Sequence, residues 1–197
     1  MRIVLASQSP SRLGILRSAG VEPVVHPAHV DEDGLLADAA GGAADKVAVL
    51  ATAKAEAVAA AYPEDVVIGC DSMLLLDGQL QGKPHTVSAT IGRWRQQAGK
   101  SAELLTGHCV LAPGGGRVVD TSSTIVHFAA ASETDIAAYA ASGEPLECAG
   151  AFTLEALGGW FIDRIEGDPS SVIGLSLPLV RRALYEFGHS VSEFWEK

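Results

Sequence analysis

The residues of this sequence best suited to chemistry are two carboxylates and three cations in the first half of the chain, namely Glu32, Asp71, Arg12, Lys54 and Lys83. Carboxylates hold divalent metal ions or accept a proton from water, and cations hold anionic phosphate groups. Polyphosphate hydrolysis needs all of these functions at one place. The set therefore points to chemistry on a phosphate anhydride, provided that the fold brings its members together.

Asp71 lies in the stretch Val66 to Pro84, between two apolar runs. The pattern predicts two short strand segments, residues 66–68 and 73–76, interrupted at residues 69–72. Asp77-Gly78 favours a tight hairpin turn, which would bring Lys83 back toward Asp71. Because an ionised carboxylate is costly to bury unless it is paired or bound to metal, Asp71 is either a satisfied structural group or a functional one.

A polar loop near the N-terminus opens a helix. Residues 3–6 are typical of a strand, and the helix is expected over residues 11–18. This layout leaves backbone N–H groups free at the start of the helix, where phosphate can bind. Arg12 stands in the first turn, where the helix dipole disfavours a cation, so it suits an anion ligand. The alternative is an ordinary capped helix with a solvated arginine.

Lys54 and Glu32 also have structural alternatives. The alanine-rich run 43–61 predicts an amphipathic helix, and Lys54 falls within its apolar stripe. A lysine there either extends its ammonium to the edge or lies in a cleft opposite an anion. Glu32 belongs to an acidic cluster at residues 31–33, which either solvates a loop or supplies ligands to Mg²⁺ or Mn²⁺.

The composition excludes several classes of protein. The chain has 197 residues and a formal net charge of -10, which argues against a nucleic-acid groove. Three widely separated cysteines form no CxxC pair, so neither a zinc site nor a disulfide framework is indicated. We find no signal peptide and no apolar run of the roughly 18 residues that a membrane span needs. A cytoplasmic protein is expected, without a membrane or nucleic-acid partner.

The rest of the chain predicts a single α/β domain over residues 1–197. Further helices are expected at 87–97, 135–141 and 177–187, and further strands at 104–112, 118–128 and 160–165. The strands 104–112 and 118–128 are joined by a short Pro-Gly-rich turn and should form an antiparallel pair. No repeat and no low-complexity linker divides the sequence.

Several motifs in this order resemble the Maf family of nucleoside triphosphate pyrophosphatases, named for septum-formation inhibition. They are LASQSPSR at the N-terminus, Asp31-Glu32, LATAKA around Lys54, IGCDS, GKP at 82–84, SGEPLECAGAF at 142–152 and IEGDPSSVIGLSL at 165–177. The resemblance implies an elongated, two-lobed mixed sheet with flanking helices, similar to the inosine-triphosphate pyrophosphatase fold, with a central cleft. It also implies a homodimer that depends on Mg²⁺ or Mn²⁺.

The resemblance assigns roles by position. Asp71 matches the catalytic base, Glu32 the metal-associated acid, and Lys54 and Lys83 the phosphate-binding lysines, so these four are the expected catalytic residues. Asp71 and Glu32 are the expected metal ligands. Ser7 and Arg12 match the serine and the second arginine of the SxSPRR loop, which binds substrate.

Three positions depart from the family branch that acts on dTTP and UTP. Ser11 replaces the first arginine of the loop, Ser72 replaces a threonine, and Glu155 replaces a glutamine. Glutamate only accepts hydrogen bonds, whereas glutamine also donates, so the exchange alters which base edge is read. Glu155 resembles the branch that acts on 7-methyl-GTP, whereas Ser11 and Ser72 match neither branch closely.

The expected function is metal-dependent hydrolysis of a canonical, modified or non-canonical nucleoside triphosphate between its α- and β-phosphates. The products are a nucleoside monophosphate and pyrophosphate, which makes the protein a hydrolase acting on acid anhydrides. The alternative is a nucleotide-binding regulator of cell division with little catalysis. A third interpretation, a structural α/β domain, requires that Asp71 and the lysines do not converge.

Overall fold

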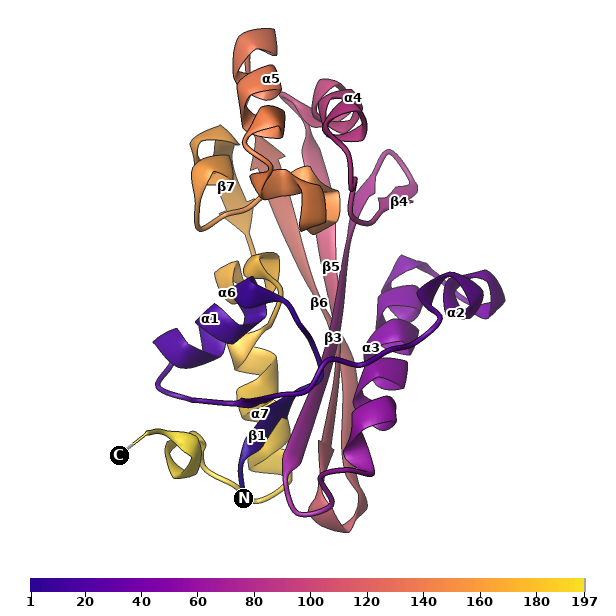
Figure 1. Cartoon of the computed structure of the whole chain (residues 1–197), viewed down its shortest axis with the longest axis vertical. Helices are drawn as coiled ribbons and strands as arrows, with labels where there is room; N and C mark the ends of the chain where they lie inside the picture. Colours follow the sequence, from indigo (N-terminus) through magenta and orange to yellow (C-terminus); the bar gives the residue numbers. More distant parts are fainter. Residues whose placement is uncertain (197) are drawn as a thin grey trace. The chain divides into compact units, whose positions relative to one another are not determined.

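The computed structural model describes residues 1–196 of the chain. The strands are β1 (Ile3–Leu5), β2 (Val24–Val25), β3 (Val66–Leu76), β4 (Gln79–Gln81), β5 (Ser101–Ala112), β6 (Gly116–Phe128) and β7 (Ile162–Glu166). They form one seven-stranded sheet in the order β2-β1-β3-β5-β6-β7, with β4 paired to β3 (Figure 1). Parallel and antiparallel pairs both occur, so the expected mixed α/β sheet is confirmed.

The α-helices are α1 (Pro10–Ser18), α2 (Glu32–Asp38), α3 (Ala43–Ala59), α4 (Val87–Gln97), α5 (Glu133–Ala141), α6 (Pro169–Ile173) and α7 (Leu177–Glu186). Short 3-10 helices are η1 (Pro113–Gly115), η2 (Glu144–Glu147), η3 (Ala149–Ala151), η4 (Leu157–Phe161) and η5 (Val191–Phe194). No helix within residues 1–196 is long and apolar enough to cross a membrane.

The chain divides into two compact units. The first contains Met1–Asp71, Thr106–Ser122 and Gly174–Lys197, and the second contains Ser72–Leu105 and Ser123–Ile173. The predicted single domain with a central cleft stays a prediction.

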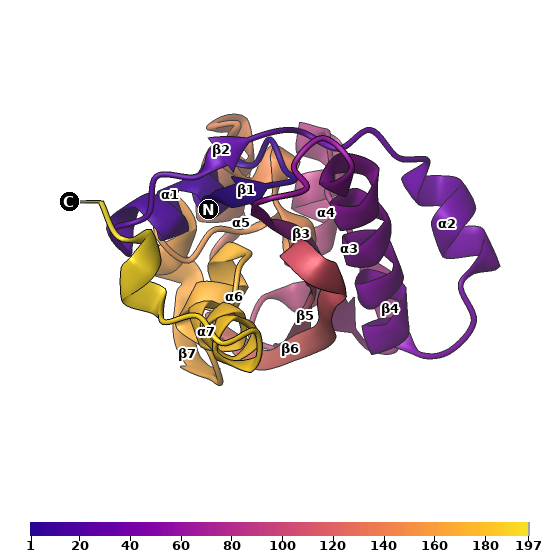
Figure 2. The ribbon, with the colours of Figure 1, turned by 90° about the horizontal axis from the view of Figure 1, so that it is seen from below.

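In the first unit, helices cover both faces of the sheet. Figures 1 and 2 show α3 on one side of β1 and β3, with α1 and α7 on the other. Strand β1 lies between β2 and β3 and is parallel to both, with Val4 opposite Val24 and Val67. Val4 and Ile68 are fully buried, as expected for parallel strands that have helices on both faces.

Helix α3 approaches the sheet so closely that only glycine fits beneath it. A Cβ atom at Gly69 would lie 2.6 Å from the backbone nitrogen of Ala55 and closer still to the carbonyl oxygen of Ala51. A Cβ atom at Gly107 on β5 would lie 2.6 Å from the backbone nitrogen of Ala48. Two glycines on two strands therefore set the position of α3.

The second unit is built around Trp94 of α4. Its ring makes T-shaped contacts with Phe128, Tyr139 and Phe161, at centroid distances of 5.5 to 5.7 Å. The indole N–H donates to the carbonyl oxygen of Ala151 at 2.7 Å. Trp94 is fully buried, so it belongs to the core.

The predicted interruption of β3 at residues 69–72 is wrong, because one strand runs from Val66 to Leu76. Gly69 accommodates the backbone of α3, and Cys70 packs as a small buried side chain. Asp71 is buried but paired, so it needs no break in the strand. The predicted hairpin is confirmed, since Leu76 pairs with Gln79 across Asp77-Gly78.

Replacing Gly69 with alanine tests the contact between α3 and β3. We expect Gly69→Ala to destabilise the protein by about 2 kcal/mol or more, because overpacking against a backbone cannot be relieved by a rotamer change. Gly14→Ala is the matched control in the same unit, since Gly14 lies inside α1 with nothing within 4 Å of its Cβ position. It should stabilise the protein by up to about 1 kcal/mol. Urea unfolding measures both; a neutral Gly69→Ala would contradict the close contact.

Candidate active site

Asp71 lies on β3 with only 7% of its surface exposed. Its Oδ1 atom accepts a hydrogen bond from Lys54 Nζ at 2.7 Å, whereas Oδ2 is buried and has no hydrogen-bond partner among residues 1–196. Burial raises the pKa of Asp71 above its ordinary value of 3.8, and the charges of Lys54 and Arg12 offset only part of that effect. The carboxylate thus has one bonded oxygen and one oxygen whose accepting capacity the described residues leave unused.

Lys54 connects the two candidate acids. Its ammonium lies 2.7 Å from Asp71 Oδ1 and 2.8 Å from Glu32 Oε1, and the residue is 9% exposed. It belongs to the buried stripe of α3, which packs on β3 at Gly69. Of the two interpretations of Lys54, the structure shows a buried lysine facing anions, although the anions are carboxylates of the chain itself.

Glu32 belongs to a helix rather than to a loop. Asp31 caps α2 by accepting a hydrogen bond from the backbone N–H of Gly34 at 3.1 Å, and Glu32 is the first residue of that helix. The Glu32 side chain is half exposed and pairs with Lys54. The acids of this cluster therefore have different roles: Asp31 caps α2, and Glu32 pairs with Lys54 in the candidate site.

Arg12 lies within the same unit and is held by several acceptors. Its Nε donates to the carbonyl oxygen of Gly174 at 2.8 Å, and its Nη1 donates to the carbonyl oxygen of Cys70 at 2.9 Å and to Ser7 Oγ at 3.3 Å. The guanidinium thus sits beside the peptide that precedes Asp71. Ser11 lies in the first turn of α1, after the cap residue Ser9.

Lys83 belongs to the second unit, where its Nζ lies 3.4 Å from Glu147 Oε2. The same carboxylate accepts a hydrogen bond from His85 Nδ1 at 3.0 Å. These three side chains are all exposed. Convergence of Lys83 with Asp71 stays a prediction.

The remaining specificity candidates are also in the second unit. Ser72 follows Asp71 on β3 and is half buried. Glu155 is exposed between η3 and η4, and its carboxylate accepts the backbone N–H of Leu154 at 3.1 Å. Their assignment to base recognition stays a prediction.

Cys70 lies next to Asp71 but has the properties of a small core residue. All three cysteines are free, and burial raises the pKa of the Cys70 thiol to about 11. A fully buried thiol that stays protonated is a poor nucleophile, as expected for a small core residue.

Sequence reasoning missed two glutamates, Glu144 and Glu147. Glu144 accepts hydrogen bonds from the segment that carries Glu155, and Glu147 pairs with Lys83. Both lie within two residues of Pro145 in the SGEPLECAGAF motif, which carries part of the family resemblance. The signal available in the sequence was a pair of acids near a proline, in an irregular segment bounded by glycines.

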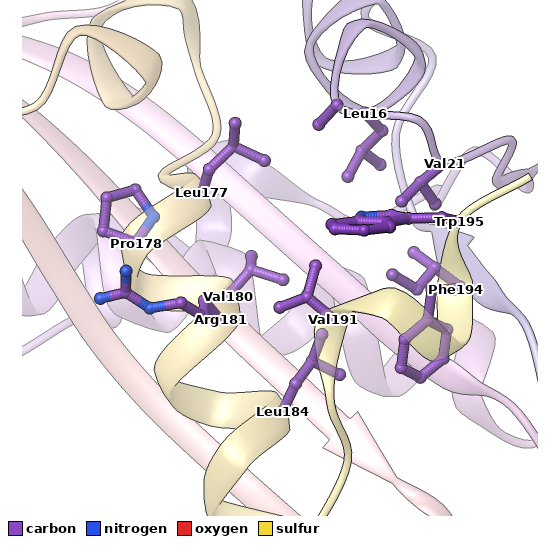
Figure 3. Close-up of a pocket in the computed structure, with 12 residues that line it drawn as sticks. Leu16, Val21, Leu177, Pro178, Val180, Arg181, Leu184, Val191, Phe194 and Trp195 are labelled. Atoms are coloured by element: carbon purple, nitrogen blue, oxygen red, sulfur yellow. The ribbon is translucent and has the colours of Figure 1, made fainter.

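An apolar cavity of about 290 Å³ lies elsewhere in the first unit, between α1, α7 and the C-terminal segment (Figure 3). Leu16, Val21, Val180, Leu184 and Trp195 line it, and Arg181 is its one charged lining residue among residues 1–196. None of its lining residues in the described part of the chain carries a carboxylate, so they supply no carboxylate base and no carboxylate ligands for a metal. The cluster around Asp71, Lys54 and Glu32 is the candidate active site.

The side chains of this cluster indicate one class of chemistry. A buried carboxylate with an unused oxygen, a second acid and two cations can activate water and hold an anionic substrate. The family model described as Maf-like protein matches residues 2–187. The chain belongs to the Maf family.

Two similar relatives, both named nucleoside triphosphate pyrophosphatase, come from Corynebacterium. The Corynebacterium diphtheriae protein is 72% identical, over 99% of this chain and 98% of the relative. The Corynebacterium efficiens protein is 71% identical, over 100% of both chains. A solved structure, the nucleoside-triphosphatase / dITP/XTP pyrophosphatase from Mycobacterium abscessus, is 18% identical with a TM-score of 0.41, covering 66% of this chain and 76% of that one.

Lys54→Met tests the electrostatics of the site. The pKa of Asp71 is higher in the folded protein than its ordinary value of 3.8 in the unfolded chain. The contribution of Asp71 to stability is therefore largest below pH 3.8 and is lost as the pH rises through the raised pKa. Removing the Lys54 charge raises that pKa further. We expect Lys54→Met to lose about 3 kcal/mol where Asp71 is ionised, and less as the pH falls toward the raised pKa.

Adding Asp71→Asn to Lys54→Met should restore part of this loss, since the amide carries no buried charge. Urea unfolding at several pH values measures all of these variants. A destabilisation that stays constant with pH in Lys54→Met would contradict the proposed coupling.

Proposed function

We propose that this Maf protein is a metal-dependent nucleoside triphosphate pyrophosphatase. It converts a nucleoside triphosphate and water into a nucleoside monophosphate, pyrophosphate and a proton. The observation that carries the proposal is the buried Asp71 carboxylate, whose Oδ1 is bound to Lys54 and whose Oδ2 has no hydrogen-bond partner in residues 1–196. The names of the Corynebacterium relatives support the same activity.

Asp71 acts as the base in this proposal. Its carboxylate accepts a proton from water as the water oxygen attacks the α-phosphorus and the bond to the β-phosphate oxygen breaks. A raised pKa makes the carboxylate a stronger base than an exposed aspartate. Arg12 fixes the peptide before Asp71, and thereby the direction of the carboxylate.

The lysines neutralise the triphosphate. Lys54 already stands between Asp71 and Glu32, where it stabilises both negative charges in the nucleotide-free protein. Lys83 contributes a further ammonium, which Glu147 partners before phosphate binds. Both are compact point charges suited to phosphate oxygens.

The donor set fits Mg²⁺ or Mn²⁺. Asp71 Oδ2 and the Glu32 carboxylate are hard oxygen donors, and Asp71 Oδ2 is an otherwise unsatisfied buried atom. Residues 1–196 contain no group of three or more His, Cys, Asp or Glu side chains arranged around a metal position. Mg²⁺ does not need one, because it is commonly held by one or two carboxylates together with substrate phosphates. When bound, the ion supplies charge neutralisation at those phosphates.

In this proposal, Ser11, Ser72 and Glu155 determine which base the protein prefers. The Glu155 carboxylate can only accept hydrogen bonds, which favours a base edge rich in donors, as in 7-methyl-GTP. A glutamine both donates and accepts hydrogen bonds, which suits the base edges of dTTP and UTP. A panel of canonical and modified triphosphates, scored for pyrophosphate release, ranks the candidates. The proposal also includes a cytoplasmic location and a homodimer, and sedimentation of the purified protein tests the homodimer.

Asp71→Asn separates catalysis from binding. We expect the variant to fold and bind nucleotide while its turnover falls by about 10²-fold or more, because the amide cannot accept the proton. Hydrolysis in H₂¹⁸O identifies the bond attacked: ¹⁸O in the nucleoside monophosphate indicates attack at the α-phosphorus, and ¹⁸O in pyrophosphate contradicts it. Near-normal turnover would eliminate Asp71 as the base.

Metal removal tests the cofactor. Pyrophosphate release should fall to background in EDTA and return with Mg²⁺ or Mn²⁺, and Glu32→Gln should raise the metal concentration needed for half-maximal activity. Undiminished hydrolysis in EDTA would remove the metal from the proposal. Absence of pyrophosphate release from any nucleotide with metal present would instead favour the regulatory alternative.

A further inference from the structure

In the second unit, the 3-10 turn η2 connects the segment that carries Glu155 to the segment that carries Lys83. It follows Gly143, whose φ of 81° lies in the left-handed region that glycine favours, and it contains the buried Pro145. Its first residue is Glu144 and its last is Glu147, and each carboxylate binds a different segment.

Glu144 binds the segment that carries Glu155. Its Oε1 accepts hydrogen bonds from Thr153 Oγ1 at 2.5 Å, from the Gly158 N–H at 3.1 Å and from the Tyr139 hydroxyl at 3.3 Å. Its Oε2 accepts the Leu157 N–H at 3.2 Å. The partners lie on both sides of Glu155, so one carboxylate fixes both ends of that segment.

Both oxygens of Glu144 face donors, which makes the carboxylate irreplaceable by an amide. A glutamine in either orientation would turn its NH₂ group toward at least one N–H or O–H donor. Partial burial alone would raise the pKa of Glu144, but the hydrogen bonds from Thr153, Gly158 and Leu157 outweigh it and lower that pKa. The group therefore stays ionised throughout the neutral range.

The other end of η2 binds the Lys83 segment. Glu147 pairs with Lys83 and His85, and the His85 N–H donates to the carbonyl oxygen of Leu146 at 2.9 Å. This end consists of the exposed contacts of Glu147 with Lys83 and His85 and one backbone hydrogen bond, whereas at the other end the Glu144 carboxylate accepts several hydrogen bonds. Substitutions at the two ends of η2 should therefore have separate effects on base selection and on phosphate binding.

We propose that Glu144 is a positioning residue for base selection, which orients Glu155 by fixing the segment 153–158. Glu147 partners Lys83 before phosphate binds and does not affect the choice of base. The inference rests on the proposed function, since it assigns Glu155 to the base and Lys83 to the phosphates.

The test compares discrimination between bases with binding of a base-free polyphosphate. Discrimination is the ratio of kcat/KM for two triphosphates that differ only in their base, such as 7-methyl-GTP and UTP. Inorganic tripolyphosphate, used as a competitive inhibitor, measures the phosphate contacts alone. Glu133→Gln is the matched control, because Glu133 is an exposed glutamate of the same unit that pairs with Arg95.

Glu144→Gln should reduce discrimination by about tenfold, because a displaced Glu155 leaves polar groups of the correct base unpaired. Its inhibition by tripolyphosphate should stay within about twofold of the wild-type value. Glu147→Gln should keep the wild-type discrimination and bind tripolyphosphate a few-fold more tightly, as expected from losing an exposed competing carboxylate. Glu133→Gln should change neither quantity.

A second pair of variants covers the case in which Glu144→Gln does not fold. Thr153→Val removes the hydroxyl that donates to Glu144 and accepts the Gly158 N–H, whereas Thr153→Ser keeps it. Discrimination should fall in Thr153→Val and return to about the wild-type level in Thr153→Ser. A folded Glu144→Gln or Thr153→Val with unchanged discrimination would overturn the inference. Wild-type protein that releases no pyrophosphate from any nucleotide would overturn the proposed function instead, and the inference with it.

Discussion

The contact on which the rest of the active site depends is the close approach of α3 to the sheet. At Gly69 and Gly107 the backbone of the helix occupies the space that a Cβ atom would take. That approach places Lys54, on the same face of α3, against Asp71, two residues beyond Gly69 on β3. A larger residue at either glycine would change the distance between the ammonium and the carboxylate, and with it the charge balance of the site.

The charge balance is unusual because the protein buries an acid and compensates for it incompletely. Removing Asp71 from water disfavours its ionised form, and Lys54 is shared with Glu32 instead of serving Asp71 alone. An ion pair built for stability would satisfy both oxygens, yet Asp71 Oδ2 has no hydrogen-bond partner within residues 1–196. Incomplete satisfaction of a buried group is typical of sites that need that group for chemistry.

Local patterns predicted the elements better than their contacts. The Asp77-Gly78 turn and the helix of residues 43–59, with Lys54 on its buried face, are encoded within a few residues, and both were predicted correctly. The continuity of β3 through Asp71 was missed, because it depends on a partner 17 residues away, Lys54. Likewise, the hydrogen bonds of Glu144 join residues that are separated by up to 14 positions and that no periodicity connects. The prediction that Lys83 meets Asp71 depends on tertiary contacts of the same kind.

Helix α2 has a place in the fold that bears on how the protein responds to its ligand. It buries none of its residues and lies beside α3 rather than on the sheet (Figure 2). The ion pair between Glu32 and Lys54 is its polar attachment to the site. A ligand that draws the ammonium of Lys54 toward itself loosens that attachment, so α2 is the element whose amide exchange rates should report first that the site is filled. The amide exchange of the α-helix that contributes least to the core would then show whether the site is occupied.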